Sequence, residues 1–377
     1  MIDNSSYQSL KDLHKVCLSQ HIPFASYRMP FQSEITSLVQ YTSFPKKIDT
    51  HQDLNKKSGF IVSPFFENEK NSTFLLEPNY ILNNKSIEKA FIQTLTNTSL
   101  FLNKKTIFEN DISDTKKVDF VQQVENAKNI ISDGKCSKIV LSKVQLDTLK
   151  NNFDASAFFL ELCDLYPHAF ISFIQLPEIG CWIGASPEPL IEISGESAYT
   201  VSLAGTQKAA SLQKKDIAWS KKEISEQKIV SDYIEATLEN NNIFNFNVKG
   251  PYTYKAGNLV HLKTEFSFKR ESIINRLRDF IDAIHPTPSV CGLPKDASMD
   301  FILNNEQHNR SYYAGYLGPI NIADETHLFV NLRCLQLFNQ QVVIYSGAGI
   351  TAASNAEKEW EETNQKMMTL LNVINKD

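Results

Sequence analysis

The spacing of apolar positions changes along the chain from about residue 118 onwards, and each spacing predicts one type of element. Between Phe120 and Ile131 apolar residues recur at helical intervals, which indicates a helix that Gly134 ends. Runs rich in β-branched and aromatic residues predict strands at 138–144, 169–176, 182–188, 190–193, 199–203 and 329–337, and helical spacing returns at 153–166 and 216–238. Strand runs broken by helices predict an α+β fold with a largely antiparallel sheet.

The first part of the chain, residues 1–117, is less clearly patterned. It is rich in Asn, Lys, Ser and Phe, with short apolar bursts at 60–62 and 74–76 and a helical pattern near 86–96. No group of chemically reactive side chains stands out there. We therefore treat residues 1–117 as a part that completes the fold, and residues 118–377 as the part that carries the chemistry.

Near the end of the chain a strand pattern changes into a helical one. Val342–Tyr345 predicts a short strand, and Gly347-Ala348-Gly349 predicts a turn that ends it. Ser354 and Glu357 match a capping box, so a helix should start at Ser354. A turn without side chains between strand and helix would let the backbone approach a ligand closely.

The same glycines also fit the G-x-G-x-x-A form of a dinucleotide-binding fingerprint. That motif needs a second strand and an acid that binds the ribose further along the chain. The sequence ends at Asp377, which leaves no room for them. This interpretation is rejected.

Acidic residues recur on one face of two predicted helices. Glu359, Glu362 and Lys366 share a face beside an apolar stripe that begins at Trp360, and Glu223 and Glu226 have the same i, i+3 spacing. Two helices that each offer a carboxylate pair could hold a hard cation such as Mg²⁺, which binds few carboxylates directly. The alternative is that both pairs lie on solvated helix faces, and the lysines at 221, 222 and 228 favour it for Glu223 and Glu226.

Composition excludes several classes of function. A hydrophobic content of 42% and a charged content of 21% are ordinary for a globular protein, and the net charge of −5 argues against nucleic-acid binding. The six cysteines show no C-x-x-C spacing, so neither a zinc site nor a disulfide framework is indicated. No signal sequence or apolar run of membrane-spanning length occurs, which predicts a cytoplasmic protein without a membrane partner.

Two basic residues could bind an anionic substrate, and two further residues could move protons. Arg333 lies in the apolar run 329–337 and, like Lys366, could hold a carboxylate; an internal ion pair is the alternative. Lys138 and Glu188 each lie at a strand boundary and could act as base and acid if their surroundings shifted both pKa values towards neutrality. His285 could donate a hydrogen bond to substrate or serve a structural role.

Together these segments resemble the chorismate-utilising enzymes. The resemblance covers about two thirds of the chain, from Val118 onwards. It rests on KIVLS at 138–142, GASPE at 184–188, LAGT at 203–206, KEISE at 222–226, HPTPS at 285–289, Arg310 with YAG at 313–315, LRC at 332–334, and GAGI at 347–350 followed by Glu359, Glu362 and Lys366. So many motifs in the same order make chance similarity untenable.

The resemblance implies a fold, a cofactor and residue roles. The fold would be a layered, largely antiparallel β-sandwich flanked by helices, and Mg²⁺ would hold the ring carboxylate of chorismate. Glu226 and Glu362 would bind Mg²⁺ directly, while Glu223 and Glu359 would act through water. The substrate-binding set would be Gly205, Thr206, His285, Ser289, Arg333, Gly347, Ala348, Gly349 and Lys366.

Two positions indicate a branch of the family. Relatives that add ammonia carry glutamine where this chain has Lys138, and aminodeoxychorismate synthases carry a lysine nucleophile where it has Ala204. The resemblance is thus strongest to isochorismate synthases, in which Lys138 would deprotonate water for addition at C2 and Glu188 would protonate the departing C4 hydroxyl.

Two other functions remain open from the sequence. Salicylate synthases use the same lysine and glutamate and then eliminate pyruvate, although HPTPSVCG at 285–292 favours the isochorismate branch. The second alternative is a homologue that binds chorismate or metal without catalysis. The presence of the full set of candidate residues argues against this alternative. Gln227 stands where many relatives have histidine. No obligate protein partner is evident. The sequence does not indicate whether the product is used for menaquinone, a siderophore or salicylate, and it does not indicate the oligomeric state.

Overall fold

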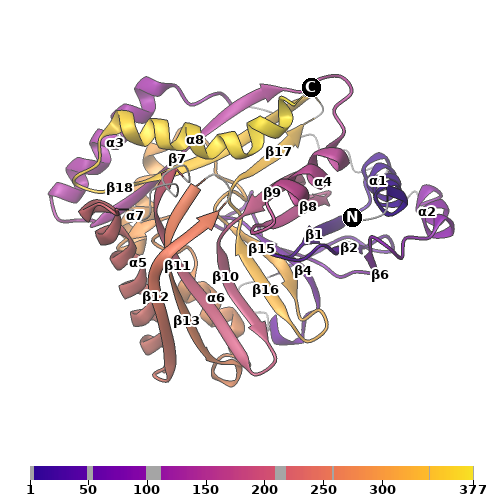
Figure 1. Ribbon diagram of the computed structural model, residues 1–377, viewed down its shortest axis with the longest axis horizontal. Coiled ribbons are helices and arrows are strands. Elements are labelled where there is room, and N and C mark those ends of the chain that lie inside the picture. The colour runs from indigo at the N-terminus through magenta and orange to yellow at the C-terminus, as the bar shows by residue number, and fades with distance from the viewer. Residues whose placement is uncertain are drawn as a thin grey trace.

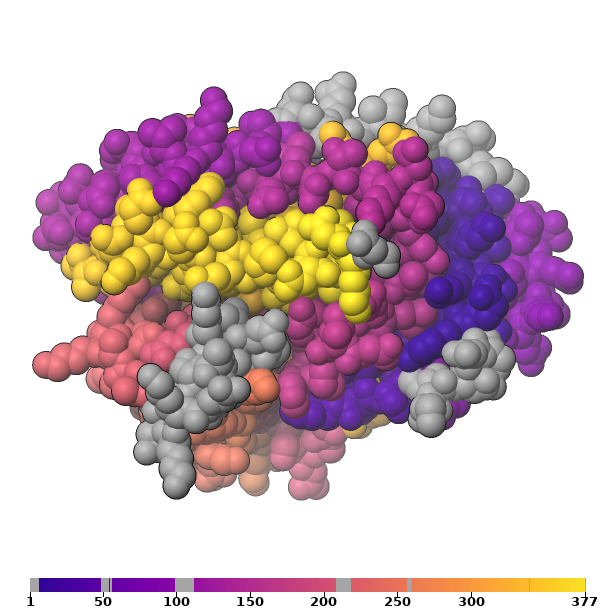
Figure 2. All heavy atoms as spheres, turned by 45° about the horizontal axis from the view of Figure 1, so that its top comes forward, coloured from indigo at the N-terminus to yellow at the C-terminus, as the bar shows by residue number. Residues whose placement is uncertain are grey.

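The computed structural model describes residues 4–48, 54–98, 112–208, 218–256, 259–338 and 340–376 (Figure 1). Its helices are α1 (Asn4–Ser19), α2 (Lys89–Thr96), α3 (Lys117–Ser132), α4 (Ala155–Leu165), α5 (Lys221–Asn240), α6 (Leu277–Ile284), α7 (Lys295–Asn305) and α8 (Ala356–Ile374). The helices α3 and α8 lie side by side over the part of the molecule formed by β7 and β18 (Figure 1, Figure 2).

The described strands form two antiparallel sheets. The first runs in the order β14 (Gly292–Leu293), β7 (Lys138–Thr148), β18 (Gln341–Ile350), β17 (Cys334–Phe338), β9 (Gly180–Ser186), β8 (Phe170–Leu176), β1 (Phe24–Arg28), β2 (Ile35–Val39) and β6 (Tyr80–Asn83). The second runs β12 (Phe246–Ala256), β13 (Leu259–Lys269), β11 (Ser197–Lys208), β10 (Pro189–Ser194), β16 (Thr326–Val330), β15 (Tyr316–Ile320), β4 (Gly59–Ser63), β5 (Phe74–Leu76) and β3 (Lys46–Lys47).

Alternation of side chains along the strands separates two hydrophobic cores. In β8, Phe170 and Ile174 point into the core shared by both sheets, while Ile171 and Phe173 point into a second core beneath α1, α4 and α8. This is the period of two expected for a strand buried on both faces. The expected α+β fold, with two antiparallel sheets flanked by helices, is confirmed.

Strands from residues 1–117 extend both sheets. β1, β2 and β6 continue the first sheet beyond β8, whereas β4, β5 and β3 continue the second sheet beyond β15. The N-terminal part therefore shares its sheets with the region that follows.

Four expectations of local structure need correction. The predicted strand 329–337 is two strands, β16 and β17, because the chain turns at Arg333 with a positive φ of 48°. The glycines 347–349 do not form a turn: they lie within β18, paired with residues 140–142 of β7. Asn355, not Ser354, caps α8, because the Asn355 side chain accepts from the backbone N–H of Lys358. Helix α5 is described from Lys221, and the start expected at Asp216 lies outside the described residues. Ile224, one of the apolar positions within the predicted helix, is 52% exposed.

Candidate active site

A pocket of about 680 Å³ opens between the two sheets and is closed at its sides by α5 and α8. Both sheets contribute to it, through β7 and β18 on one side and β11 and β13 on the other. The sequence-predicted residues that line it are Lys138, Glu188, Gly205, Thr206, Glu226, Ser289, Arg333, Gly347, Gly349, Glu362 and Lys366. Segments up to about 230 residues apart in the sequence thus meet at one place.

Lys138 is the first residue of β7 and is held there by backbone pairing with Leu293 of β14. Its side chain is only 1% exposed, and its Nζ lies 2.9 Å from Oε1 of Glu226 on α5. A buried ammonium needs such a partner, because an unpaired charge away from water is strongly disfavoured. The pair joins the first sheet to α5, and both residues line the pocket.

Glu188 lies in the short connection between β9 and β10, where the chain passes from the first sheet to the second. Burial raises the pKa of its carboxyl to about 7, although Lys138, the Ser289 hydroxyl and Lys366 nearby all act in the opposite direction. At neutral pH a large fraction of Glu188 therefore carries a proton that it can donate. The pocket brings this acid together with the Lys138 amine.

The acidic face of α8 is paired with lysines. Nζ of Lys366 lies 2.7 Å from Oε1 of Glu362 and donates to the Gly347 carbonyl at 2.8 Å. Burial alone would raise the pKa of Glu362, but Lys366, Lys222 and Arg333 outweigh it and hold this pKa below its ordinary value. Glu359 lies deeper, at 2% exposure, and accepts from Lys222 at 2.5 Å. Burial raises the pKa of Glu359 despite that partner.

Glu223 has a local structural role at the start of α5. Its Oε2 accepts from the backbone N–H of Ser220 at 2.7 Å and from the Gln207 amide at 2.9 Å, while the Ser220 hydroxyl accepts from the Glu223 N–H at 3.4 Å. This is a complete capping box. Glu223 does not line the pocket, and neither does Glu359.

Glycine is required at 349 because the site fills the space where a side chain would lie. A Cβ at Gly349 would come within 2.5 Å of Oε1 of Glu226 and 2.8 Å of Cε of Lys138. One at Gly347 would lie 2.8 Å from the Tyr313 hydroxyl. The absence of side chains at these two glycines, which lie within β18, therefore leaves the space that Glu226, Lys138 and Tyr313 occupy. Ala348, between the two, packs its side chain into the core and does not line the pocket.

Arg333 occupies the break between β16 and β17. Its left-handed backbone is uncommon for a residue with a side chain, and Arg333 lines the pocket. Burial lowers the pKa of Arg333 to about 10, so it stays positively charged at neutral pH. It donates to Oγ1 of Thr369 at 3.2 Å, and no carboxylate of the described chain lies within 4.0 Å of it. The internal ion pair considered from sequence is absent among these residues.

His285 lies outside the pocket, contrary to expectation. Its ring is 8% exposed and packs edge-on against Tyr316, with 5.0 Å between ring centroids. Burial lowers the pKa of His285 to about 3. The next segment of this loop does reach the site, because Ser289 lines the pocket and donates to the Leu203 carbonyl at 3.1 Å.

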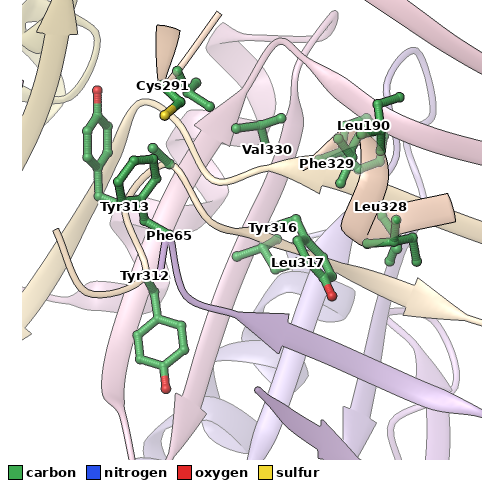
Figure 3. Packing of buried hydrophobic residues seen from close by; sticks show 14 of the residues in the cluster. Phe65, Leu190, Cys291, Tyr312, Tyr313, Tyr316, Leu317, Leu328, Phe329 and Val330 are labelled. Atoms are coloured by element: carbon green, nitrogen blue, oxygen red, sulfur yellow. The ribbon is translucent and has the colours of Figure 1, made fainter. Parts of the chain in front are cut away.

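The site residues named from sequence omit four pocket-lining residues with polar groups: His261, Tyr313, Tyr345 and Ser346. His261 on β13 has Nδ1 3.0 Å from the Gly205 carbonyl, which can only accept, so Nδ1 carries the hydrogen and Nε2 is a free acceptor. Tyr345 is stacked between Trp182 and Tyr313, at 5.3 and 5.4 Å. Figure 3 shows Tyr313 and its neighbour Tyr312 pointing in opposite directions. Strand alternation is the only signal that could have indicated His261.

The carboxylates expected to bind Mg²⁺ suit that ion chemically, since it prefers oxygen ligands. Glu226 and Glu362 both line the pocket and are the pair that could hold it directly. Each is bound by a lysine, however, and within the described ranges no three acidic, His or Cys side chains form a ready metal cluster. Occupancy would require Lys138 and Lys366 to release their partners. Gln227, at the position of the expected histidine, instead joins α5 to Ser202 and Thr264.

Comparison with known proteins agrees with this geometry. Residues 2–375 match the family described as chorismate binding enzyme. The chain belongs to this family. Isochorismate synthase EntC of Escherichia coli strain K12 is 28% identical over 261 residues, 68% of this chain and 66% of that protein. Anthranilate synthase component 1 of Acetivibrio thermocellus is also 28% identical, over 75% of this chain and 58% of that protein.

The solved structure of MenF, the menaquinone-specific isochorismate synthase from Escherichia coli, shares the fold of this chorismate-binding family member. Its TM-score is 0.74 at 19% identity, and the likeness covers 100% of this chain and 92% of that one. The matched segments make up about two thirds or less of the two curated relatives, whose names carry different activities. No helix in the described ranges is long and apolar enough to cross a bilayer.

Proposed function

We propose that this chorismate-binding protein is an isochorismate synthase, which converts chorismate to isochorismate with Mg²⁺ as cofactor. One observation carries the proposal: a buried lysine and a buried carboxyl with a pKa of about 7 line the same pocket. A lysine and a protonated carboxyl placed in one pocket are the two groups that general base and general acid catalysis require. The name of the Escherichia coli EntC relative supports the same activity.

The residues present can account for both proton transfers. The Lys138 amine, once released from Glu226 and deprotonated, accepts a proton from the water whose oxygen bonds to C2. Glu188 donates its proton to the C4 hydroxyl, which leaves as water while the ring double bonds shift. One water enters and one leaves, so the product has the mass of the substrate. Holding base, acid and substrate together turns the step into an effectively unimolecular one.

Two cationic groups suit a substrate with two carboxylates. Arg333 offers a planar pair of donors, and no carboxylate of the described residues lies within 4.0 Å of it, which suits a bidentate contact with substrate. Lys366 on α8 donates to the carbonyl of Gly347 on β18, lines the pocket and can contact substrate there. When bound between Glu226 and Glu362, Mg²⁺ would offset the negative charge of the remaining substrate carboxylate.

The direct test is to incubate the purified protein with chorismate and Mg²⁺ and to analyse products by chromatography and mass spectrometry. We expect an isomer of unchanged mass that disappears with EDTA. We also expect Lys138→Ala to abolish it while chorismate still binds, since the lysine is needed for the proton transfer and Arg333 for binding. Salicylate and pyruvate, beyond the spontaneous decay of isochorismate, would instead indicate a salicylate synthase. Anthranilate formed in the presence of ammonia would indicate an anthranilate synthase. Chorismate binding without turnover would indicate a non-catalytic homologue.

A further inference from the structure

Lys143 is a buried lysine that the proposed chemistry does not use. It lies on β7 five residues after Lys138, and because side chains alternate along a strand the two point to opposite faces. Lys138 faces the pocket, whereas Lys143 faces α8 and is 2% exposed.

Both close partners of Lys143 belong to α8. Its Nζ lies 3.4 Å from the centre of the Trp360 ring and donates to the side-chain oxygen of Asn364. No carboxylate of the described chain comes within 4.0 Å of Nζ, and Glu361 and Asp114 are the charged groups that face it at longer range. Burial lowers the pKa of Lys143 to about 8, so the ammonium persists at neutral pH and makes a cation–π contact.

This contact acts on the helix that supplies part of the pocket. Trp360 and Asn364 are one turn apart and share a face of α8, while Glu362 and Lys366 project from a different face. Successive residues are about 100° apart around a helix, so holding one face determines where the others point. The Trp360 ring is also packed against Phe120 of α3, at 5.6 Å between centroids. Its position is thereby fixed from two sides.

A charged side chain is a costly way to fill such a space. An unpaired cation in the interior is disfavoured, and a methionine of similar length would avoid that cost. Unlike methionine, however, an ammonium has directional preferences for a ring face and an amide oxygen. The lysine therefore specifies an orientation that apolar packing would leave looser.

We propose that Lys143 is a positioning residue: by holding Trp360 and Asn364 it fixes the rotation of α8 about its axis, and so the direction in which Glu362 and Lys366 enter the pocket. The proposal rests on the proposed function in that these two side chains act on substrate and cofactor. The orientation of α8 itself can be measured independently of any activity.

The test compares Lys143→Met and Lys143→Arg with the wild type and with Lys117→Met. Lys117 on α3 makes an exposed ion pair with Glu357 of α8. It serves as a matched control, because it is also a lysine that contacts α8. In Lys143→Met we expect amides 356–366 to exchange hydrogen several-fold faster, by mass spectrometry, and kcat to fall about 10- to 100-fold. Lys143→Arg keeps a cation that can stack on Trp360. Its amide exchange rate and its kcat should therefore lie within about threefold of the wild-type values. Lys117→Met should match the wild type.

Other outcomes overturn the proposal. Wild-type exchange in α8 of Lys143→Met would show that the lysine does not orient the helix. Faster exchange throughout the protein, without rescue by arginine, would show a merely structural role. If Lys143→Met does not fold, Trp360→Phe, which keeps an aromatic face, is compared with Trp360→Leu; equal exchange in these two would contradict the proposal. A wild type that never converts chorismate would count against the proposed function alone, and the exchange comparison would still decide the role of Lys143.

Discussion

At the scale of single residues, Glu188 shows how position changes the chemistry of a side chain. Its neighbours Lys138 and Lys366 favour the charged carboxylate, but burial at 4% exposure outweighs them. The sequence could indicate Glu188 as a candidate acid because GASPE resembles a family motif. It could not give the pKa, since residues from β7 and α8 that are distant in sequence contribute to it. The same applies to His261, which only the paired strands bring to Gly205.

We predict that kcat/KM falls as the pH rises through about 7, because Glu188 must be protonated to act as the acid. Glu188→Gln should lower kcat by about 10²- to 10⁴-fold and remove this limb of the profile. The folded-state pKa is raised, so Glu188 stabilises the fold at acid pH and loses that contribution as the pH passes 7. Urea unfolding at pH 5 and pH 8 should therefore show less pH dependence in Glu188→Gln than in the wild type. If kcat/KM of Glu188→Gln still falls as the pH rises through about 7, a group other than Glu188 is responsible for that pH dependence.

At the scale of elements, apolar spacing predicted α3, α4 and the strands β7 to β11, but it did not predict α1, α6, α7, β12 or β13, and it did not give the ends of several elements. β18 continues through Gly347 and Gly349 because β7 supplies backbone partners across the whole segment, which outweighs the preference of glycine for turns. Arg333 interrupts a run that is apolar enough for one long strand, and only the change from one sheet to the other explains the break. In both cases the partner strand, rather than the local sequence, decides.

The start of α5 yields a prediction that separates two roles of Glu223. As half of a capping box it should matter for stability, so Ser220→Ala and Glu223→Ala should each lower the free energy of unfolding by about 1 kcal/mol. Neither change should alter the Mg²⁺ concentration needed for half-maximal turnover. The exposed Ser225→Ala on the same helix is the control. A weaker Mg²⁺ response in Glu223→Ala alone would restore the role through water that the family resemblance implies.

At the scale of the whole molecule, a buried ion pair joins parts of the chain that carry the site. Arg310 binds Glu306 through two nitrogens, at 2.8 and 2.5 Å, and donates to the carbonyls of Val140 and Val290, which both line the pocket. Glu306 in turn accepts from the backbone N–H of Ser142 on β7 at 2.6 Å. The pair therefore connects β7 to the loop that carries Ser289.

We predict that Arg310→Met lowers the free energy of unfolding by about 3–5 kcal/mol, because it leaves Glu306 buried without its counter-ion. Arg270→Met removes an ion pair with Asp324, whose side chain is 79% exposed, and should lower the free energy of unfolding far less than Arg310→Met does. Urea unfolding of both variants gives the comparison. Similar losses would mean that Glu306 finds water or another donor when Arg310 is absent.

The place of β18 in the first sheet affects how the protein can be made. β18 pairs with β7 on one side and β17 on the other, although β7 is completed almost 200 residues earlier in the sequence. During synthesis β7 must therefore wait with an open edge until the last strand leaves the ribosome, and such edges invite pairing with other chains. Pairings this distant in sequence also slow folding. A ribosome that stalls before Gln341 would release a product prone to aggregate, so translation speed and chaperone supply should govern the yield of this protein more than its final stability does.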